Sequence, residues 1–146
     1  MEKVIISACL LGVRCRYDGK SNKLPDETLE MLMQRYDLIP VCPECYGGLT
    51  TPRVPSERLE DRVVSKAGAD VTAEFQKGAS AVLYLAQLFG AKKAILKKNS
   101  PSCGSGTIYD GTFTGTVVPG DGVTAELLKN NAVTVLNESE LSKILF

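Results

Sequence analysis

KVIISA, residues 3–8, is a short apolar run that is followed at once by a polar loop. A run of this length without alternation is typical of a strand buried on both faces, as in a parallel sheet. Short apolar cores also occur in DLIPVC (37–42), KKAILK (92–97) and AVTVL (132–136). The sequence therefore predicts four buried strands.

Helices are predicted between and after these strands. In residues 71–89, apolar side chains recur at three- and four-residue steps, which is the pattern of one helix face. Further helices are predicted over about 26–36, after Asp121, and over ESELSKILF (138–146). Asp26 and Asp121 are the expected N-caps, because an aspartate side chain accepts hydrogen bonds from free backbone N–H groups.

Strand and helix alternate along the whole chain. Parallel neighbours need a right-handed crossover, which a helix supplies. We expect one α/β domain, residues 1–146, in which helices cover both faces of a four-stranded, mainly parallel sheet of Rossmann-like or flavodoxin-like type. RLEDRVVSK (58–66) predicts a small extra hairpin, and the Pro-, Gly- and Thr-rich stretch 43–57 is expected to be a long, non-helical loop.

The charge balance limits the partners. Lys and Arg number 17 and Asp and Glu number 17, so the net charge is zero and no excess of basic residues favours a nucleic acid polymer or an anionic membrane. The apolar stretch from Val4 to Val13 has no basic region ahead of it and runs into Arg14 and Arg16. We therefore expect a cytoplasmic protein without a membrane span, as a monomer or small homo-oligomer.

The chain contains five cysteines and no histidine. Without imidazole, Ser/His and Cys/His nucleophilic arrangements and His-containing zinc sites are excluded. An odd number of widely spaced cysteines argues against a disulfide framework in a reducing compartment. Metal binding or catalysis is the favoured use of these thiols.

Three of the cysteines follow predicted strands. Cys9 lies just past the first, Cys42 ends the second, and Cys103 lies in the loop after the third. Carboxyl ends of parallel strands share one edge of the sheet, and ligands bind where the strand order reverses. We expect the three thiols to meet there, although each cysteine could instead be a small buried apolar residue.

Two kinds of metal centre suit these thiols. Three thiolates without histidine fit an iron–sulfur cluster, in which a missing fourth ligand leaves one iron open to substrate. The alternative is a structural zinc ion held by Cys9, Cys42, Cys45 and Cys103 in a binding module. A redox dithiol from Cys42 and Cys45 is less favoured, because no helix is expected to follow Cys42.

Three blocks resemble the signature blocks of the thiouracil desulfidase family: SACLLGVRCRYDG (7–19), PVCPECYGGLTTPRVPSE (40–57) and LKKNSPSCGSG (96–106). The resemblance implies an α/β fold that holds a 4Fe-4S cluster with one open iron site. It also implies a small-molecule substrate, a thiolated nucleobase such as 2-thiouracil. The resemblance further implies that water replaces the sulfur without net redox change and that the sulfur leaves as hydrogen sulfide.

The resemblance also implies roles for individual residues. It places the cluster on Cys9, Cys42 and Cys103. By motif position, Glu44 is the acid/base group that activates water, and Ser100 is the hydroxyl that hydrogen-bonds the substrate or relays a proton. Without the resemblance, these two residues would be a solvated loop carboxylate and a turn-forming serine.

Some residues of the same blocks stay open. Cys15 is either an alternative ligand or a thiol beside the ligands, and the role of Cys45 is undecided. Four charged residues of these loops either bind substrate or hold the loops in shape: Arg14, Arg16, Asp18 and Arg53.

Overall fold

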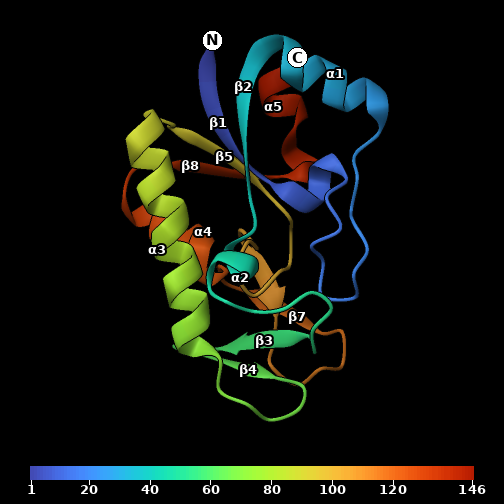
Figure 1. The fold of residues 1–146 in the computed structure, drawn as a ribbon, viewed down its shortest axis with the longest axis vertical. Coiled ribbons are helices and arrows are strands. Elements are labelled where there is room, and N and C mark those ends of the chain that lie inside the picture. Colours follow the sequence, from blue (N-terminus) through green and yellow to red (C-terminus); the bar gives the residue numbers. More distant parts are fainter.

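A four-stranded parallel sheet forms the centre of the computed structural model, which describes residues 1–146 (Figure 1). Its strands lie in the order β2-β1-β5-β8. Their bounds are Glu2–Ser7 for β1, Tyr36–Val41 for β2, Lys93–Leu96 for β5 and Thr134–Asn137 for β8. The prediction of four short parallel strands is confirmed, with each strand within two residues of its expected position.

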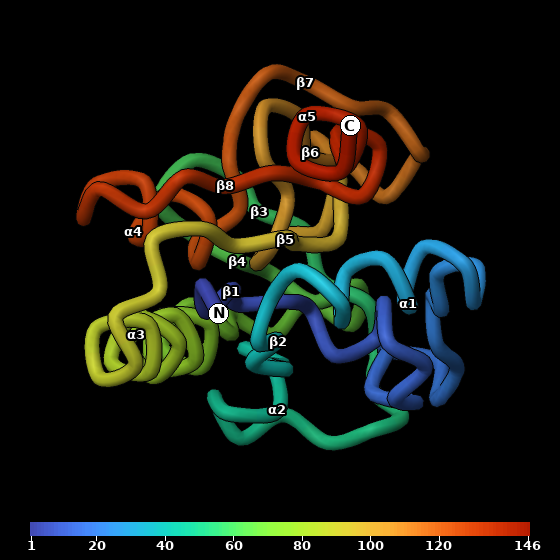
Figure 2. The backbone as a smooth tube through the Cα atoms, turned by 90° about the horizontal axis from the view of Figure 1, so that it is seen from above, coloured from blue at the N-terminus to red at the C-terminus, as the bar shows by residue number.

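Helices cover both faces of this sheet, as predicted (Figure 2). α3 (Thr72–Phe89) and α4 (Val123–Asn130) pack on one face, and α1 (Asp26–Arg35) and α5 (Ser142–Leu145) pack on the other. None of the helices combines the length and apolar character that crossing a bilayer needs.

Two apolar cores result, one on each face of the sheet. Ile5 belongs to the core that contains Val82 and Leu128, whereas Val4 and Ile6 belong to the core that contains Leu32 and Leu145. Successive strand residues point to opposite faces, so a strand covered on both sides is apolar throughout. This arrangement explains the uninterrupted run in KVIISA.

The strand order reverses between β1 and β5. The chain passes from β1 to β2 on one side and then crosses to β5 on the other. This order matches the first four strands of a flavodoxin-like sheet. Ser7, the last residue of β1, joins the two strands at the reversal, because its Oγ accepts the backbone N–H of Lys97 at 3.0 Å.

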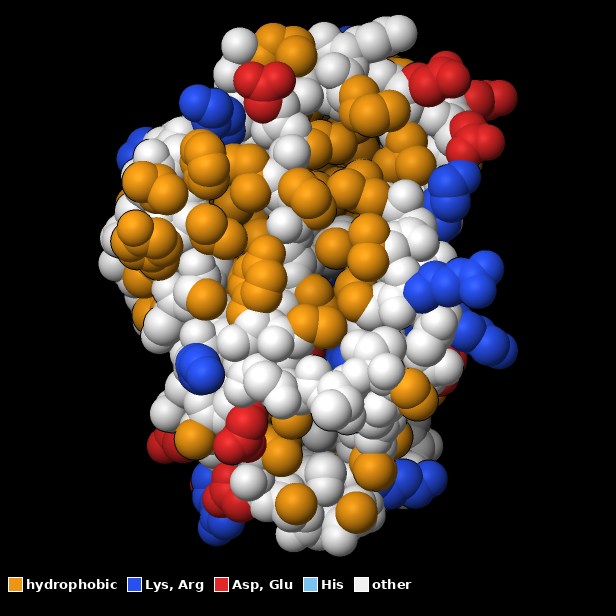
Figure 3. All heavy atoms as spheres, in the orientation of Figure 1, with side chains coloured by type: hydrophobic (Ala, Val, Ile, Leu, Met, Phe, Trp, Pro, Cys, Tyr) orange, Lys and Arg blue, Asp and Glu red, His pale blue; other side chains and the backbone are white.

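The outer edge of β2 is unpaired. On the face of the molecule that Figure 3 shows, apolar side chains gather over the region where α3 and β2 lie in Figure 1. Tyr84 and Leu88 of α3 are among the exposed apolar residues. Pro40 lies in β2 and has no N–H to offer another strand, a common feature of edge strands.

The loops that follow β1 and β2 are more regular than predicted. Ala8–Leu11 form a short 3-10 helix, η1, and Pro43–Tyr46 form a short helix, α2. The expectation that residues 43–57 contain no helix is therefore wrong. Pro43 occupies the first turn of α2, where a proline lacks only an N–H that would have no partner inside the helix.

Both predicted aspartate caps are wrong. Pro25 is the N-cap of α1, and Asp26 lies inside the helix and pairs with Lys23. Gly122 is the N-cap of α4, and Asp121 instead accepts the backbone N–H of Gly106 at 2.8 Å. The first N–H groups of α4 donate to the carbonyls of residues 101 and 102, so they need no side-chain cap.

The predicted closing helix is divided into η2 (Glu138–Glu140) and α5, which are separated at Leu141. The predicted hairpin is present as β3 (Ser56–Leu59) and β4 (Arg62–Ser65). A second antiparallel hairpin, β6 (Thr107–Tyr109) and β7 (Val117–Pro119), was not predicted. Both hairpins lie beyond the carboxyl ends of the sheet (Figure 1).

Candidate functional site

A cavity of about 490 Å³ opens at the carboxyl ends of β1, β2 and β5. Cys9 lies in η1 after β1, Cys42 directly follows β2, and Cys103 lies in the loop after β5. All three line the cavity, and so do Glu44 and Ser100. The structure therefore brings the five candidate site residues to one place, at the reversal of strand order.

Cys103 is held by a turn within SPSCG. The Oγ of Ser100 accepts the backbone N–H groups of Ser102 and Cys103, both at 3.1 Å. A Cβ on Gly104 would lie 2.8 Å from the carbonyl oxygen of Ser100, and one on Gly122 would lie 2.4 Å from the carbonyl carbon of Ser102. Ser100 and Gly104 thus allow a tight turn at Cys103, and Gly122 allows this turn to pack against the start of α4.

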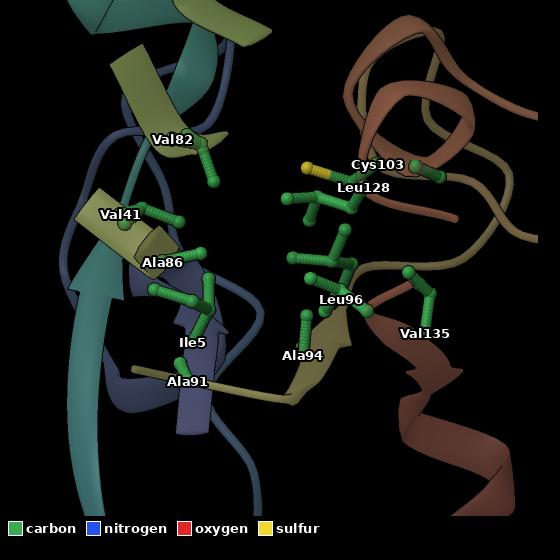
Figure 4. Packing of buried hydrophobic residues seen from close by; sticks show 12 residues of the cluster. Ile5, Val41, Val82, Ala86, Ala91, Ala94, Leu96, Cys103, Leu128 and Val135 are labelled. Atoms are coloured by element: carbon green, nitrogen blue, oxygen red, sulfur yellow. The ribbon is translucent and has the colours of Figure 1, made fainter. Parts of the chain in front are cut away.

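The thiol of Cys103 lies at the boundary between the cavity and the core. Cys103 is only 6% exposed and belongs to the apolar cluster on the α3 and α4 side, beside Leu128 (Figure 4). Burial raises the pKa of the Cys103 thiol, and a hydrogen bond with the side chain of Ser7 acts in the opposite direction.

Cys9 is half-buried, and burial raises its pKa while a hydrogen bond with Asn22 opposes the rise. Cys42 is the N-cap of α2. Its pKa is raised first by a hydrogen bond with the thiol of Cys15 and then by burial. Cys9 and Cys42 are close enough that the charge of one would raise the pKa of the other.

The two cysteines of undecided role lie in different places. Cys15 lines the cavity, and the Sγ of Cys42 contacts its backbone carbonyl at 3.9 Å. The hydrogen bond between these thiols lowers the pKa of Cys15. Cys45 does not line the cavity, and its Sγ lies 3.6 Å from the Oγ1 of Thr51.

The donor set fits an iron–sulfur cluster better than a single ion. Cys45 does not line the cavity with Cys9, Cys42 and Cys103, so the structure does not bring the four expected zinc ligands together, and no three Cys, Asp or Glu side chains are placed to hold one metal ion. A 4Fe-4S cluster is several atoms across and takes its thiolate ligands from the wall of a cavity, which is where Cys9, Cys42 and Cys103 lie. The cavity wall also includes Arg16, whose Nε is buried without a protein partner.

Glu44 is held in the cavity wall by an ion pair. Its Oε2 accepts from the Nε of Arg53 at 2.9 Å and from the Nη2 at 2.6 Å. The side chains are 17% exposed for Glu44 and 9% exposed for Arg53. Burial lowers the pKa of Arg53, but the neighbouring Glu44 carboxylate outweighs burial and raises the pKa overall.

Close packing against α3 sets the position of α2. A Cβ on Gly78 of α3 would lie 1.8 Å from the carbonyl oxygen of Pro43. A Cβ on Gly47, which follows α2, would lie 2.0 Å from the carbonyl oxygen of Glu74. The two backbones can approach this closely only because glycine occupies both positions, and α2 carries Glu44 between Cys42 and Cys45.

The hairpins contribute residues to the cavity that sequence reasoning missed. Tyr109 and Phe113 belong to the second hairpin and its loop, and both line the cavity. Glu57 of β3 is 8% exposed and accepts the backbone N–H groups of Gly111 at 2.9 Å and Phe113 at 3.1 Å. One carboxylate therefore joins both hairpins beside the cavity.

Arg16 and Asp18 are bonded to each other within the loop that follows β1. Arg16 donates to Asp18 at 2.7 Å and to Asn22 at 3.0 Å, and it also lines the cavity. Arg14 is exposed and does not line the cavity. These bonds hold the loop in shape, and because Arg16 also lies in the cavity wall, substrate binding by Arg16 stays a prediction.

Fold and site together define a doubly wound α/β protein with a thiol-lined cavity at the reversal of its strand order. A family model described as 2-thiouracil desulfurase matches residues 4–140, and the chain belongs to this family. This membership confirms the resemblance seen in the three sequence blocks.

Two similar proteins cover nearly the whole chain. A solved structure of a 4Fe-4S-dependent thiouracil desulfidase, TudS, is 45% identical, covers 99% of this chain and 95% of that chain, and superposes with a TM-score of 0.94. The protein YbbK of Bacillus subtilis (strain 168), itself uncharacterised, is 41% identical over 97% of this chain and 99% of its own length.

Proposed function

We propose that this protein is a desulfidase that converts a thiolated nucleobase such as 2-thiouracil into the corresponding oxo base. One water molecule enters, the C=S bond is replaced by C=O, and the sulfur leaves as hydrogen sulfide, so no electrons are gained or lost. The family and the TudS structure support this function. The observation that carries it is the convergence of three thiols, a carboxylate and a hydroxyl on one cavity.

Cys9, Cys42 and Cys103 would hold a 4Fe-4S cluster. When bound, the cluster supplies an open, Lewis-acidic iron that polarises the C=S bond and accepts the sulfur. Cys15 contacts Cys42, but we do not assign it as a ligand of the cluster. Cys45 lies outside the cavity and is not assigned as a ligand either.

Glu44 is the proposed general base. Its carboxylate lines the cavity and is ion-paired through Oε2, and Oε1 makes no hydrogen bond within the protein. A carboxylate with one anchored oxygen can take a proton from water with the other oxygen, as general base catalysis requires.

Ser100 is the proposed hydrogen-bond donor to the substrate. A serine hydroxyl has one donor and two acceptor positions. Both acceptor positions of Ser100 are used by the N–H groups of Ser102 and Cys103, so the O–H proton is free to point into the cavity. The same hydroxyl would thus stabilise the SPSCG turn that carries Cys103 and donate a hydrogen bond to the substrate.

We propose that residues 1–146 act as a single domain, since the cavity is lined by residues between Ser7 and Gly115, which belong to the loops after three strands of the sheet and to both hairpins. Five free thiols are suited to a reducing compartment, and we place the enzyme in the cytoplasm.

Anaerobic reconstitution with iron and sulfide tests this function. We expect about four irons per chain and sulfide release from 2-thiouracil. Cys103→Ser should lose the iron, whereas Cys45→Ser, which removes a thiol outside the cavity, and Cys15→Ser should keep it. Stoichiometric zinc in place of iron, or iron without any sulfide release from thiolated bases, would contradict the proposal.

A further inference from the structure

The guanidinium group of Arg53 uses all five of its N–H donors within the protein. Nε donates to Glu44 Oε2, and Nη2 donates to the same oxygen and to the Cys15 carbonyl at 2.9 Å. Nη1 donates to the Thr50 carbonyl at 3.2 Å and to the Thr51 Oγ1 at 3.0 Å. An arginine has no sixth donor, so Arg53 has none left for a substrate.

These bonds tie together three segments around the cavity. The segment at Cys15 is held by the side chain, and the backbone N–H of Arg53 donates to the carbonyl of Tyr17 at 2.7 Å. Helix α2 is held through Glu44, and the loop of Arg53 itself is held through residues 50 and 51. Glu44 is therefore bound to a rigid group that is fixed on every side.

We infer that Arg53 is the positioning residue for Glu44: it fixes the carboxylate by one oxygen and leaves the other oxygen free for the reaction. This inference rests on the proposed function, because it assigns Arg53 a role through the general base. It also decides between the two readings of Arg53 in the sequence, which were substrate binding and loop geometry.

Lysine cannot replace arginine in this role. A guanidinium is a planar fork that directs several N–H groups at fixed angles, whereas an ammonium is a single charge on a flexible stem. Only 9% of the Arg53 side chain is exposed, so water cannot easily replace the lost hydrogen bonds. A lysine would preserve the charge next to Glu44 and lose the geometry.

The test is a double-mutant cycle of Arg53→Lys and Glu44→Gln in the reconstituted holoenzyme, with iron content, kcat and KM for 2-thiouracil measured for each variant. A misplacement of about 1 Å costs on the order of a hundredfold in rate, so Arg53→Lys should lower kcat roughly tenfold to a hundredfold with KM nearly unchanged. In the Glu44→Gln background, Arg53→Lys should lower kcat by no more than about twofold, because residues that act as one unit are not additive.

A second readout does not depend on turnover. The thermal unfolding midpoint of the holoenzyme, followed by circular dichroism, should fall in each single variant and fall little further in the double variant. This measurement also covers the case in which Arg53→Lys retains too little activity for a KM.

The outcomes separate the two proposals. Additive losses in kcat, or a higher KM with unchanged kcat in Arg53→Lys, would overturn the positioning role and indicate substrate binding. A wild-type holoenzyme without sulfide release would overturn the proposed function instead. Full activity of Glu44→Gln would remove the base through which Arg53 is inferred to act and so would overturn the inference.

Discussion

Gly78 lies in α3, which does not line the cavity, yet we expect Gly78→Ala to impair the cavity's function. The added Cβ would lie 1.8 Å from the carbonyl oxygen and 2.6 Å from the carbonyl carbon of Pro43. Non-bonded atoms settle at about 3.5 Å, so α2 would have to move away from α3 by roughly 1.7 Å. Pro43 lies between Cys42 and Glu44, and both would be displaced with it.

The expected cost follows from this displacement. Overpacking of a tight contact costs about 1–3 kcal/mol of stability, and a shift of about 1 Å at reacting groups costs on the order of a hundredfold in rate. We expect Gly78→Ala to lower the unfolding free energy, the iron content after reconstitution and the kcat of sulfide release. Urea unfolding, iron analysis and a sulfide assay measure the three quantities.

The sign of the stability change is a sharp check. Helix propensity alone favours alanine over glycine by about 1 kcal/mol, so a contact of no importance would make Gly78→Ala more stable. Lys77→Ala changes an exposed neighbour in the same helix and serves as the matched control. A stabilised Gly78→Ala variant with normal iron and turnover would refute the argument that α3 positions α2.

Two further predictions concern carboxylates outside the reaction. Glu57→Ala should leave two backbone N–H groups without their acceptor and loosen the loop that carries Phe113, so we expect a higher KM for 2-thiouracil at unchanged iron content. Glu57→Gln keeps an acceptor oxygen and should stay nearer to wild type. An unchanged KM in Glu57→Ala would count against the loop as part of the substrate site. Hydrogen bonds from Thr72, with help from Arg62, lower the pKa of Asp70 to about 2 from 3.8, so its stabilising contribution is present above the unfolded pKa and is lost as the pH falls through the range from about 4 to about 2. The stability difference between wild type and Asp70→Asn should shrink over that range in urea titrations, and a constant difference would contradict the assignment.

The parallel sheet and the meeting of the three thiols were predictable because both depend on local patterns and one topological rule. Val4, Ile5 and Ile6 form an unbroken apolar run because β1 is covered on both faces, and that run is visible in consecutive residues of the sequence. The positions of Cys9, Cys42 and Cys103 after three such strands then placed the thiols at one edge of the sheet. Glu44 and Ser100 had no local signal of their own and became candidates only through the resemblance to a family.

The short and capped elements were not predictable in the same way. α2 has four residues, too few for a helical period, and its proline suggested a loop. Asp121 is a residue type that often caps helices, but the first N–H groups of α4 donate to carbonyls of the SPSCG turn and not to the Asp121 side chain. In both cases a contact with a segment distant in the chain outweighed the local preference.

The sequence alone therefore determined the fold class, the strand ends that carry the thiols and the family, because apolar periodicity and motif spacing are properties of contiguous residues. Only the tertiary structure decided that Cys15 lies inside the cavity and Cys45 outside it, that the two hairpins wall the cavity, and that Arg53 holds Glu44 by one oxygen. These arrangements depend on distances and directions between side chains of separate loops, and such geometry exists only after the chain has packed.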